Sequence, residues 1–391
     1  MKTTYWFTSP VTGLVGALFL MFSQVAGAGC DDSYNVTHHE ITGKLDICDI
    51  EEHLDPNFRI LTNWGTKPEW LNDNQFVFLS NQIGDVYLMD LETNDVSIIT
   101  GHFEHSGFTR AHKLQNGDLL LLGPSSGAQP PLDPLSIYDK GQFTGDLWVL
   151  KAPYDKAPIA LNVHAWEGIA VSTESNRIAW SDTSKPFYGN NLFITGLNYF
   201  FAHSNLWSGE IVYDELGMPY LDKVEKIVRK YDVGLVFFEP QNFRGEGDGQ
   251  LLFEAYGPTS SGTSDTYIYD FQLGSHAKID NAKGYNEWEG ISPDYNKIFL
   301  EVDPTATNIS GPATIDLYVY DFIDRGLTSI FTYSSDPMMQ GFYVHEPVYS
   351  PNGGFSLMAA YSFSVQLPLI AHTDTNFVLK AKDFSGLMAE V

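Results

Sequence analysis

The segment Glu287-Trp288-Glu289-Gly290-Ile291-Ser292-Pro293-Asp294, followed by the apolar run Lys297 to Val302, decides the fold. A glutamate opens a short apolar segment, a turn follows, and a strand-like run begins. The same order recurs in four further segments: Lys67-Pro68-Glu69-Trp70, Ala165-Trp166-Glu167-Gly168, Phe238-Glu239-Pro240 and His345-Glu346-Pro347. In a ring of repeated units, a carboxylate that recurs at one place becomes part of a ring of carboxylates around the axis.

Each copy continues with short apolar runs separated by turns rich in Gly, Asn, Asp and Pro, which is typical of all-β structure. A sixth copy begins near His112. The spacing from Glu69 to Glu346 (346 minus 69, over five steps) averages about 55 residues, near the roughly 40 to 50 of known propeller repeats. The sequence therefore predicts an all-β fold, a β-propeller of six four-stranded blades, with seven blades or a β-sandwich as alternatives. We expect the segment Glu40 to Leu61 to supply a strand that closes the ring.

The N-terminus has the features of a secretory signal peptide. Lys2 supplies a positive charge, Val11 to Phe22 an apolar stretch too short to span a bilayer, and Ala26-Gly27-Ala28 a small-x-small cleavage site. We therefore expect a secreted protein, extracellular or periplasmic. Its expected parts are a signal peptide at 1–28, an N-terminal segment at 29–56 and a single propeller domain at 57–391.

The two cysteines of the chain, Cys30 and Cys48, both follow the cleavage site. In an oxidising compartment they are expected to form a disulfide that pins the mature N-terminus, and metal binding by the pair is the alternative. Lipidation of Cys30 stays open, although Gly27 stands where such signals usually have Leu, Val or Ile.

The charge of the chain limits its partners. Acidic residues outnumber basic ones by 49 to 22, which gives a formal net charge of −27. Without a basic stripe, binding to anionic lipid is disfavoured and binding to nucleic acid is excluded. The sequence predicts a monomer without nucleic-acid or membrane partners.

The glutamates and the longest insertions are expected to share one side of the disc. In a propeller, the connections between blades and the loops between second and third strands lie on the same side. The longest insertions fall in those loops: Gly123 to Gly145, Ser181 to Asn205, Tyr256 to Asp265, Asp303 to Thr314 and Ser362 to Asn376. This arrangement predicts a ligand site over one mouth of the ring.

Carboxyl groups crowded around an axis acquire different pKa values, and glycoside hydrolysis needs a protonated acid beside an ionised partner. The candidate catalytic residues are Glu167, Glu239, Glu289, Glu346, His164 and His345. In the alternative reading, each glutamate caps backbone amides of a neighbouring blade. The histidines could instead act as a base for β-elimination from a uronic acid, or hold a divalent metal, whereas hydrolysis requires no cofactor.

A second set of side chains is suited to binding a carbohydrate or glycoside substrate. Arginine pairs bidentately with carboxylates, and tryptophan stacks on sugar rings, although core packing is an equal alternative for tryptophan. The candidate substrate-binding residues are Glu69, Arg110, His112, Arg244, Trp166 and Trp288.

Two resemblances to known families follow from these motifs. Gly290-Ile291-Ser292-Pro293-Asp294 and Tyr349-Ser350-Pro351-Asn352-Gly353 resemble the WD40-like repeat of TolB-type propellers, whose common form is Trp-Ser-Pro-Asp-Gly. That resemblance implies the fold and leaves open a non-catalytic propeller that binds a protein or glycan. Pro130 to Tyr138, Gly145 to Leu150 and Arg244-Gly245-Glu246-Gly247 resemble fungal secreted saponin hydrolases. Those enzymes release a glucuronic-acid-containing sugar chain, so this resemblance implies a glycoside hydrolase acting on a glycoside or glucuronide.

Overall fold

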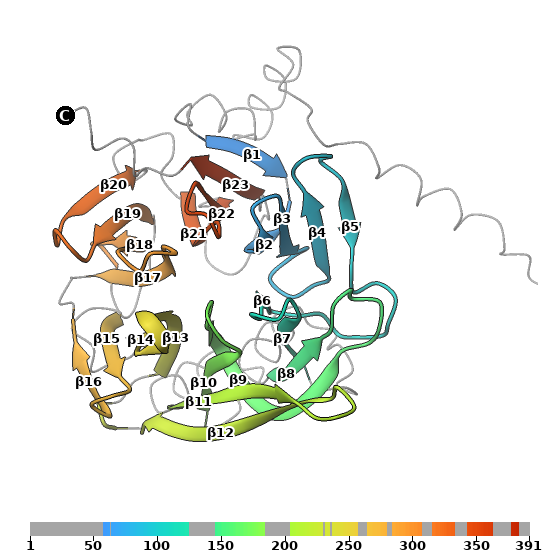
Figure 1. Cartoon of the computed structure of the whole chain (residues 1–391). Coiled ribbons are helices and arrows are strands. Elements are labelled where there is room, and N and C mark those ends of the chain that lie inside the picture. The colour runs from blue at the N-terminus through green and yellow to red at the C-terminus, as the bar shows by residue number, and fades with distance from the viewer. Residues whose placement is uncertain are drawn as a thin grey trace, which may run out of the picture.

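A computed structural model describes residues 58–62, 64–124, 145–183, 204–229, 231–234, 237–256, 264–279, 284–306, 315–332, 342–362 and 377–382. Within these ranges antiparallel sheets stand around a central axis, as Figure 1 shows. The predicted all-β propeller architecture is confirmed. The predicted signal peptide, the Cys30–Cys48 disulfide and most residues of the long insertions lie outside the described residues.

Of the four four-stranded sheets within the described ranges, three have their strands in chain order from the axis outward. The first consists of β2 (Thr66–Asn72), β3 (Gln75–Leu79), β4 (Val86–Asp90) and β5 (Val96–Ile98). The second consists of β13 (Phe237–Arg244), β14 (Gln250–Tyr256), β15 (Ser264–Asp270) and β16 (Ser275–Lys278), with the 3-10 helix η1 (Glu246–Asp248) after β13. The third consists of β17 (Tyr285–Ile291), β18 (Lys297–Asp303), β19 (Asp316–Asp321) and β20 (Leu327–Phe331).

The last sheet joins both ends of the described chain. It contains β21 (Phe342–Tyr349), β22 (Phe355–Ser362) and β23 (Phe377–Lys382), and its outermost strand is β1 (Phe58–Thr62). β1 pairs antiparallel with β23, from Phe58 opposite Ala381 to Thr62 opposite Val378. The predicted closure of the ring by the segment that ends near Leu61 is therefore confirmed.

The remaining sheet has seven strands because one strand serves two units. Its strands are β6 (Arg110–Lys113), β7 (Leu119–Pro124), β8 (Gly145–Leu150), β9 (Ile159–Val171), β10 (Arg177–Thr183), β11 (Ser204–Tyr213) and β12 (Pro219–Val228). The first half of β9, up to Ala165, pairs with β8, and its second half, from Trp166, pairs with β10. β9 is thus the outermost strand beside β8 and the innermost strand beside β10.

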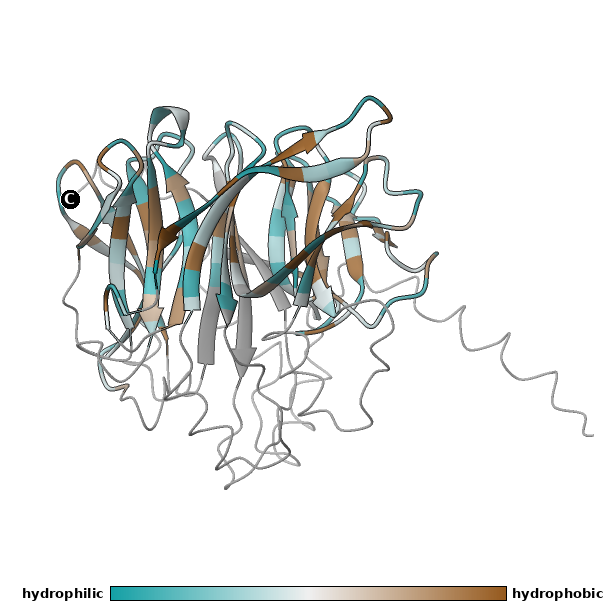
Figure 2. Cartoon of the chain, turned by 90° about the horizontal axis from the view of Figure 1, so that it is seen from below, coloured by the Kyte–Doolittle hydropathy of each residue, from teal (hydrophilic) through white to brown (hydrophobic). Residues whose placement is uncertain are grey.

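Packing between neighbouring sheets builds the core. The run Leu119 to Leu122 is buried at every position, since a middle strand of a propeller sheet is covered on both faces. The outer strand β5 is exposed at all three positions. In the side view of Figure 2, hydrophobic residues lie along the strands and hydrophilic residues gather at the turns.

Most innermost strands are interrupted beside their glutamate. The pairing register shifts between Thr66 and Glu69 in β2, between Trp166 and Ile169 in β9, between Pro240 and Asn242 in β13, between Glu289 and Ile291 in β17, and between His345 and Val348 in β21. A bulge bends its strand and redirects side chains. These bulges lie at the axis, where they turn charged side chains toward the centre of the ring.

The glycine that follows the glutamate in two copies of the repeat is required for steric reasons. Gly290 has a φ of 46°, and a Cβ atom there would lie 1.9 Å from the Pro347 carbonyl oxygen. A Cβ atom on Gly168 would lie 2.3 Å from Cγ of Glu239. Glycine at these positions lets neighbouring innermost strands approach closely and leaves room for the Glu239 side chain.

Candidate active site

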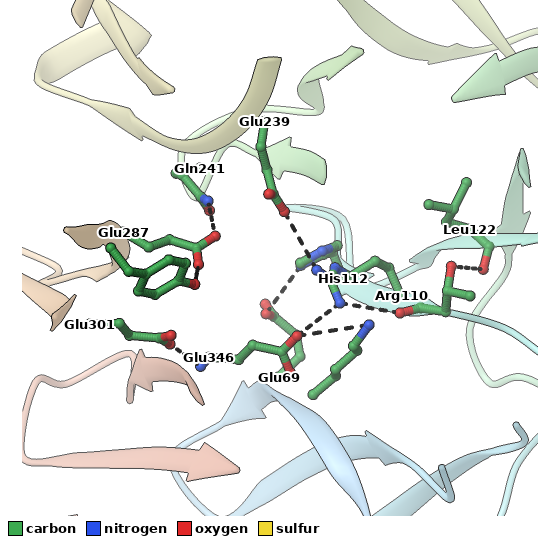
Figure 3. Close-up of polar contacts among 12 residues, drawn as sticks. Glu69, Arg110, His112, Leu122, Glu239, Gln241, Glu287, Glu301 and Glu346 are labelled. Atoms are coloured by element: carbon green, nitrogen blue, oxygen red, sulfur yellow. Dashed lines mark hydrogen bonds and ion pairs between the residues drawn. The ribbon is translucent and has the colours of Figure 1, made fainter. Parts of the chain in front are cut away.

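A cavity of about 420 Å³ lies on the axis and is lined by residues of β2, β6, β9, β13, β17 and β21. The structure brings together in this cavity most of the carboxyl groups singled out by the sequence, together with four basic side chains; the charged and imidazole residues of this set are Lys67, Glu69, Arg110, His112, Lys113, Glu239, Glu289 and Glu346. Figure 3 shows how several of them converge from different strands.

The described lining residues of the cavity extend toward the face of the disc opposite the face that the sequence predicted. The lining continues from the glutamates to turns that join first and second strands, including Ser172, Ser292 and Ser350. Those turns lie on the other side of the disc from the connections between second and third strands, where the insertions occur. The expectation was wrong because it placed the glutamates at the start of the innermost strands, whereas they lie within these strands. Glu289, for example, is the fifth of seven residues in β17.

Arg110 connects two carboxylates across the cavity. Its two terminal nitrogens lie 2.9 Å from Oε1 of Glu346 and 3.6 Å from Oε1 of Glu239. The Arg110 side chain is 11% exposed, so these contacts are poorly screened by water. A guanidinium in this position favours the ionised form of both carboxyl groups.

Lys67 adds a second buried cation to the cavity. Its Nζ atom lies 3.8 Å from Oε1 of Glu346, and the residue is buried. Lys67 was not among the candidates predicted from the sequence, although its segment is one of the repeated copies. The available signal was the pair Lys67-Pro68, which matches Glu346-Pro347 in the last copy.

Glu289 has the opposite environment. Burial raises the pKa of Glu289 well above its usual value, and the carboxyl groups of Glu301, Glu239 and Glu346 raise it further, against the effect of Arg110. Glu289 therefore keeps its proton at a pH where an exposed glutamate is ionised. The cavity combines a carboxyl group that holds its proton more tightly than usual with two carboxyl groups that lie beside Arg110.

Glu301 is a further buried carboxyl that the sequence analysis did not select. It lies on β18, is 0% exposed, and accepts a hydrogen bond of 2.6 Å from the backbone N–H of Glu346. Burial raises the pKa of Glu301 well above its usual value. A glutamate that ends the repeated runs Gln250 to Glu254 and Lys297 to Glu301 was the signal for it.

His112 and Glu69 form a pair at the cavity wall. Nδ1 of His112 lies 3.4 Å from Oε2 of Glu69. The Nε2 atom of His112 is buried, and it has no hydrogen-bond partner among the described residues. A carboxylate on one ring nitrogen orients the other nitrogen, which is the arrangement that a histidine base requires.

His164 is wrong as a member of the site. It lies in the half of β9 that pairs with β8, its side chain is 83% exposed, and it forms an ion pair with Asp146. The sequence suggested proximity to Glu167, but β9 runs from the outside of the ring to the axis between these two residues.

Trp166 and Trp288 are wrong as platforms for sugar rings. Each is 4% exposed. Trp166 stacks on Phe237 with ring centroids 5.0 Å apart, and Trp288 packs against Tyr320 and Phe322 at 5.0 and 5.8 Å. The apolar side chains next to the glutamates fill the space between blades, so the core-packing alternative holds.

Arg244 is wrong as a holder of a substrate carboxylate. Its guanidinium lies 4.0 Å from the centre of the Phe322 ring and donates hydrogen bonds to the Tyr295 carbonyl and to Oε1 of Gln250. These contacts tie together the turns at the end of two blades. The side chains of Glu167 and His345, the two remaining candidates, lie outside the described part of the structure.

The described ranges contain neither a cluster of metal ligands nor a membrane-spanning helix. In those ranges, no group of three or more His, Cys, Asp or Glu side chains is arranged to hold a metal ion. None of the segments described forms a helix long and apolar enough to cross a membrane.

No protein-family model and no curated protein sequence matches the chain. Among solved structures, TolB from Acinetobacter baumannii is similar with 11% identity and a TM-score of 0.47, and the match covers 83% of this chain and 65% of that chain. An oligogalacturonate lyase from Vibrio parahaemolyticus has 11% identity and a TM-score of 0.45, over 83% of this chain and 90% of that chain. An oligogalacturonate lyase in complex with manganese has 10% identity and a TM-score of 0.46, over 85% and 93% of the two chains. The resemblance to saponin hydrolases stays a prediction.

Proposed function

We propose that this protein is a secreted, six-bladed propeller enzyme that hydrolyses a glycosidic bond in its axial cavity. One observation carries the proposal: Glu289, whose pKa is raised by burial, shares a cavity with Glu239 and Glu346, both of which contact Arg110. Glycoside hydrolysis uses this contrast between an acid and an ionised carboxylate.

Glu289 acts as the general acid. Its carboxyl group gives its proton to the glycosidic oxygen as the bond from that oxygen to the anomeric carbon breaks. The ionised carboxylates stabilise the positive charge that develops on the sugar ring. Water then supplies a hydroxyl group to the anomeric carbon and a proton to the enzyme, so that Glu289 regains its acid form.

Glu239 is the better candidate for the nucleophile, or for the base that activates water. Its Oε1 atom lies 3.6 Å from Arg110, whereas Glu346 has a contact of 2.9 Å with Arg110 and a second contact with Lys67. A carboxylate with weaker ion pairs keeps more of its nucleophilicity. Glu346 then serves to hold Arg110 and to stabilise charge.

The charges of the cavity favour an uncharged glycoside over a glucuronide. Both buried cations, Lys67 and Arg110, already lie beside carboxylates. A substrate carboxylate would have to compete with these enzyme carboxylates for Lys67 and Arg110, which leaves the half-buried Lys113 as the further lysine of the described lining. The chain's net charge of −27 also repels an anionic substrate.

Two alternatives rest on other features. A uronate lyase is favoured by the His112–Glu69 pair, because His112 could remove the proton next to a substrate carboxylate. A non-catalytic propeller that binds a glycan or protein is favoured by Glu301, whose carboxyl group is engaged by backbone.

Assays of the purified protein on aryl glycosides and aryl glucuronides test the proposal. Glu289→Gln should lower kcat/KM by about 10²- to 10⁴-fold, the usual contribution of a general acid. Glu215→Gln, which changes an exposed glutamate in the turn after β11, is the control and should match the wild type. Equal turnover in both variants would remove the proposal, and an unsaturated uronate product would favour the lyase.

A further inference from the structure

Two buried glutamates occupy matching positions in neighbouring sheets. Glu254 on β14 lies opposite Glu239, and Glu301 on β18 lies opposite Glu287, both in antiparallel register with an innermost strand. Both are 0% exposed. Since a buried carboxyl group is costly without partners, each must have a structural or chemical role.

Both glutamates bind the backbone of the next innermost strand. Oε1 of Glu254 accepts a hydrogen bond of 3.2 Å from the N–H of Trp288, and Oε1 of Glu301 accepts one of 2.6 Å from the N–H of Glu346. These contacts tie neighbouring sheets together at the axis. A glutamine could make the same contact through its side-chain oxygen.

The two positions differ in what they support. Glu254 also accepts a hydrogen bond of 2.7 Å from Thr266, and its backbone partner Trp288 belongs to the core. The partner of Glu301 is Glu346, which has a φ of 53° in the bulge of β21 and carries a carboxylate into the cavity. A non-glycine residue in this conformation persists only when its surroundings hold it there.

Glu301 also lies on the strand paired with that of the acid, opposite Glu287, two residues before Glu289. Burial is the main cause of the raised pKa of Glu289, and the Glu301 carboxyl group is the largest of the charged contributors. The other groups that act on Glu289 are Glu239 on β13, Glu346 on β21 and Arg110 on β6. When two carboxyl groups interact strongly, the first proton is lost from the pair more easily than the second.

We propose that Glu301 is a positioning residue of the active site, which holds the Glu346 backbone in its bulge and, from the strand paired with β17, sets the electrostatic environment of Glu289. The inference rests on the proposed role of Glu289 as the acid. It assigns to one buried side chain both the placement of a carboxylate and the electrostatic environment of the acid.

The experiment compares Glu301→Gln with Glu254→Gln. Both variants keep an oxygen that can accept the backbone hydrogen bond, and only the first removes a carboxyl group on the strand paired with that of Glu289. In Glu301→Gln the alkaline limb of the kcat/KM profile should move to lower pH by about one unit, the size of shift expected from one nearby like charge. Glu254→Gln should keep the wild-type profile, and identical profiles in all three proteins would overturn the inference.

A third variant separates placement from protonation. Glu301→Ala removes the acceptor as well as the charge, so kcat should fall at every pH because the Glu346 bulge relaxes. An alanine variant with the same kcat as Glu301→Gln at low pH would overturn the placement role.

A measurement without substrate distinguishes this inference from the proposed function. In protein labelled with ¹³C at glutamate carboxyl groups, the signal of Glu289 is identified by its loss in Glu289→Gln, and its titration is followed by NMR. The pKa of Glu289 should be lower in Glu301→Gln than in the wild type. An unchanged pKa overturns the inference, whereas a lowered pKa in a protein without glycosidase activity overturns only the proposed function.

Discussion

Lys67 and Glu346 occupy equivalent bulges on adjacent innermost strands, with φ angles of 54° and 53°, and each precedes a proline. Their side chains meet with Nζ of Lys67 3.8 Å from Oε1 of Glu346. The first and last copies of the repeat thus keep one backbone conformation and carry opposite charges. β1 closes the ring at its circumference, and this ion pair joins the same two ends at the axis.

Replacement of Lys67 by methionine tests the ion pair. Glu346 keeps its 2.9 Å contact with Arg110 when Lys67 is replaced, so the loss of unfolding free energy should be below the about 3–5 kcal/mol of an isolated buried pair and above that of an exposed pair. Urea denaturation measures the change. Lys223→Met, at an exposed pair with Glu210, is the control and should leave stability nearly unchanged. Equal stability of the two variants would contradict a structural role for Lys67.

The pH dependence of stability tests the state of Glu289. Its pKa is raised by burial in the folded protein, so the folded state binds the proton more tightly than the unfolded state. The unfolding free energy of the wild type therefore declines as pH rises from the unfolded value of about 4.3 toward the folded pKa. Glu289→Gln removes this decline.

The melting temperature of Glu289→Gln should exceed that of the wild type at pH 7.5 and approach it at pH 4. Thermal unfolding followed by circular dichroism at both pH values measures the difference. A variant that is less stable than the wild type at pH 7.5 would contradict a buried, protonated Glu289.

Arg110 should not be replaceable by lysine. Its two terminal nitrogens contact Glu346 and Glu239 separately, whereas a lysine ammonium is a single point charge on a flexible stem. Arg110→Lys and Arg110→Met should both lower kcat/KM by at least about tenfold, the effect of a 1.4 kcal/mol loss. Full activity in Arg110→Lys would show that the cavity needs only the charge.

A single methyl group at Gly168 should reduce activity. The Cβ atom of an alanine there would lie 2.3 Å from Cγ of Glu239, so that side chain must move. Gly168→Ala should lower kcat more than it changes KM, since a misplaced catalytic group affects the chemical step. Gly326→Ala is the control, because a Cβ atom there meets nothing within 4 Å. Kinetics of the two variants decide the point, and equal kcat values would contradict a catalytic Glu239.

The recurrence of glutamates predicted the ring and the convergence of Glu69, Glu239, Glu289 and Glu346, because repetition in sequence becomes rotation about an axis in a closed ring. The repeat could not tell which neighbours of each glutamate face the axis. A bulge shifts the alternation of side chains by one residue, which explains why Trp166 and Trp288 are buried between blades. His164 was misplaced because nothing in its local sequence shows that β9 changes partners at Trp166.

Lys67 and Glu301 show the limits of a motif search by residue type. Lys67 shares a conformation and a following proline with Glu346 but has the opposite charge. Glu301 belongs to a second strand, and its link to the site depends on a contact between sheets, 45 residues apart in sequence, with the backbone of Glu346. Comparing the residues that flank the equivalent position in each copy identifies Lys67 from the sequence. Glu301 is identified by the three-dimensional structure.

The 13-residue strand β9 belongs to two neighbouring blades. Elsewhere a loop separates the outer strand of one blade from the inner strand of the next, and a loop can absorb a displacement. β9 passes from one blade to the next without a loop. A displacement of the outer half of β9, beside β8, is therefore transmitted to Gly168 at the cavity wall through continuous strand backbone. We expect these two blades to open and exchange amide hydrogens as one cooperative unit.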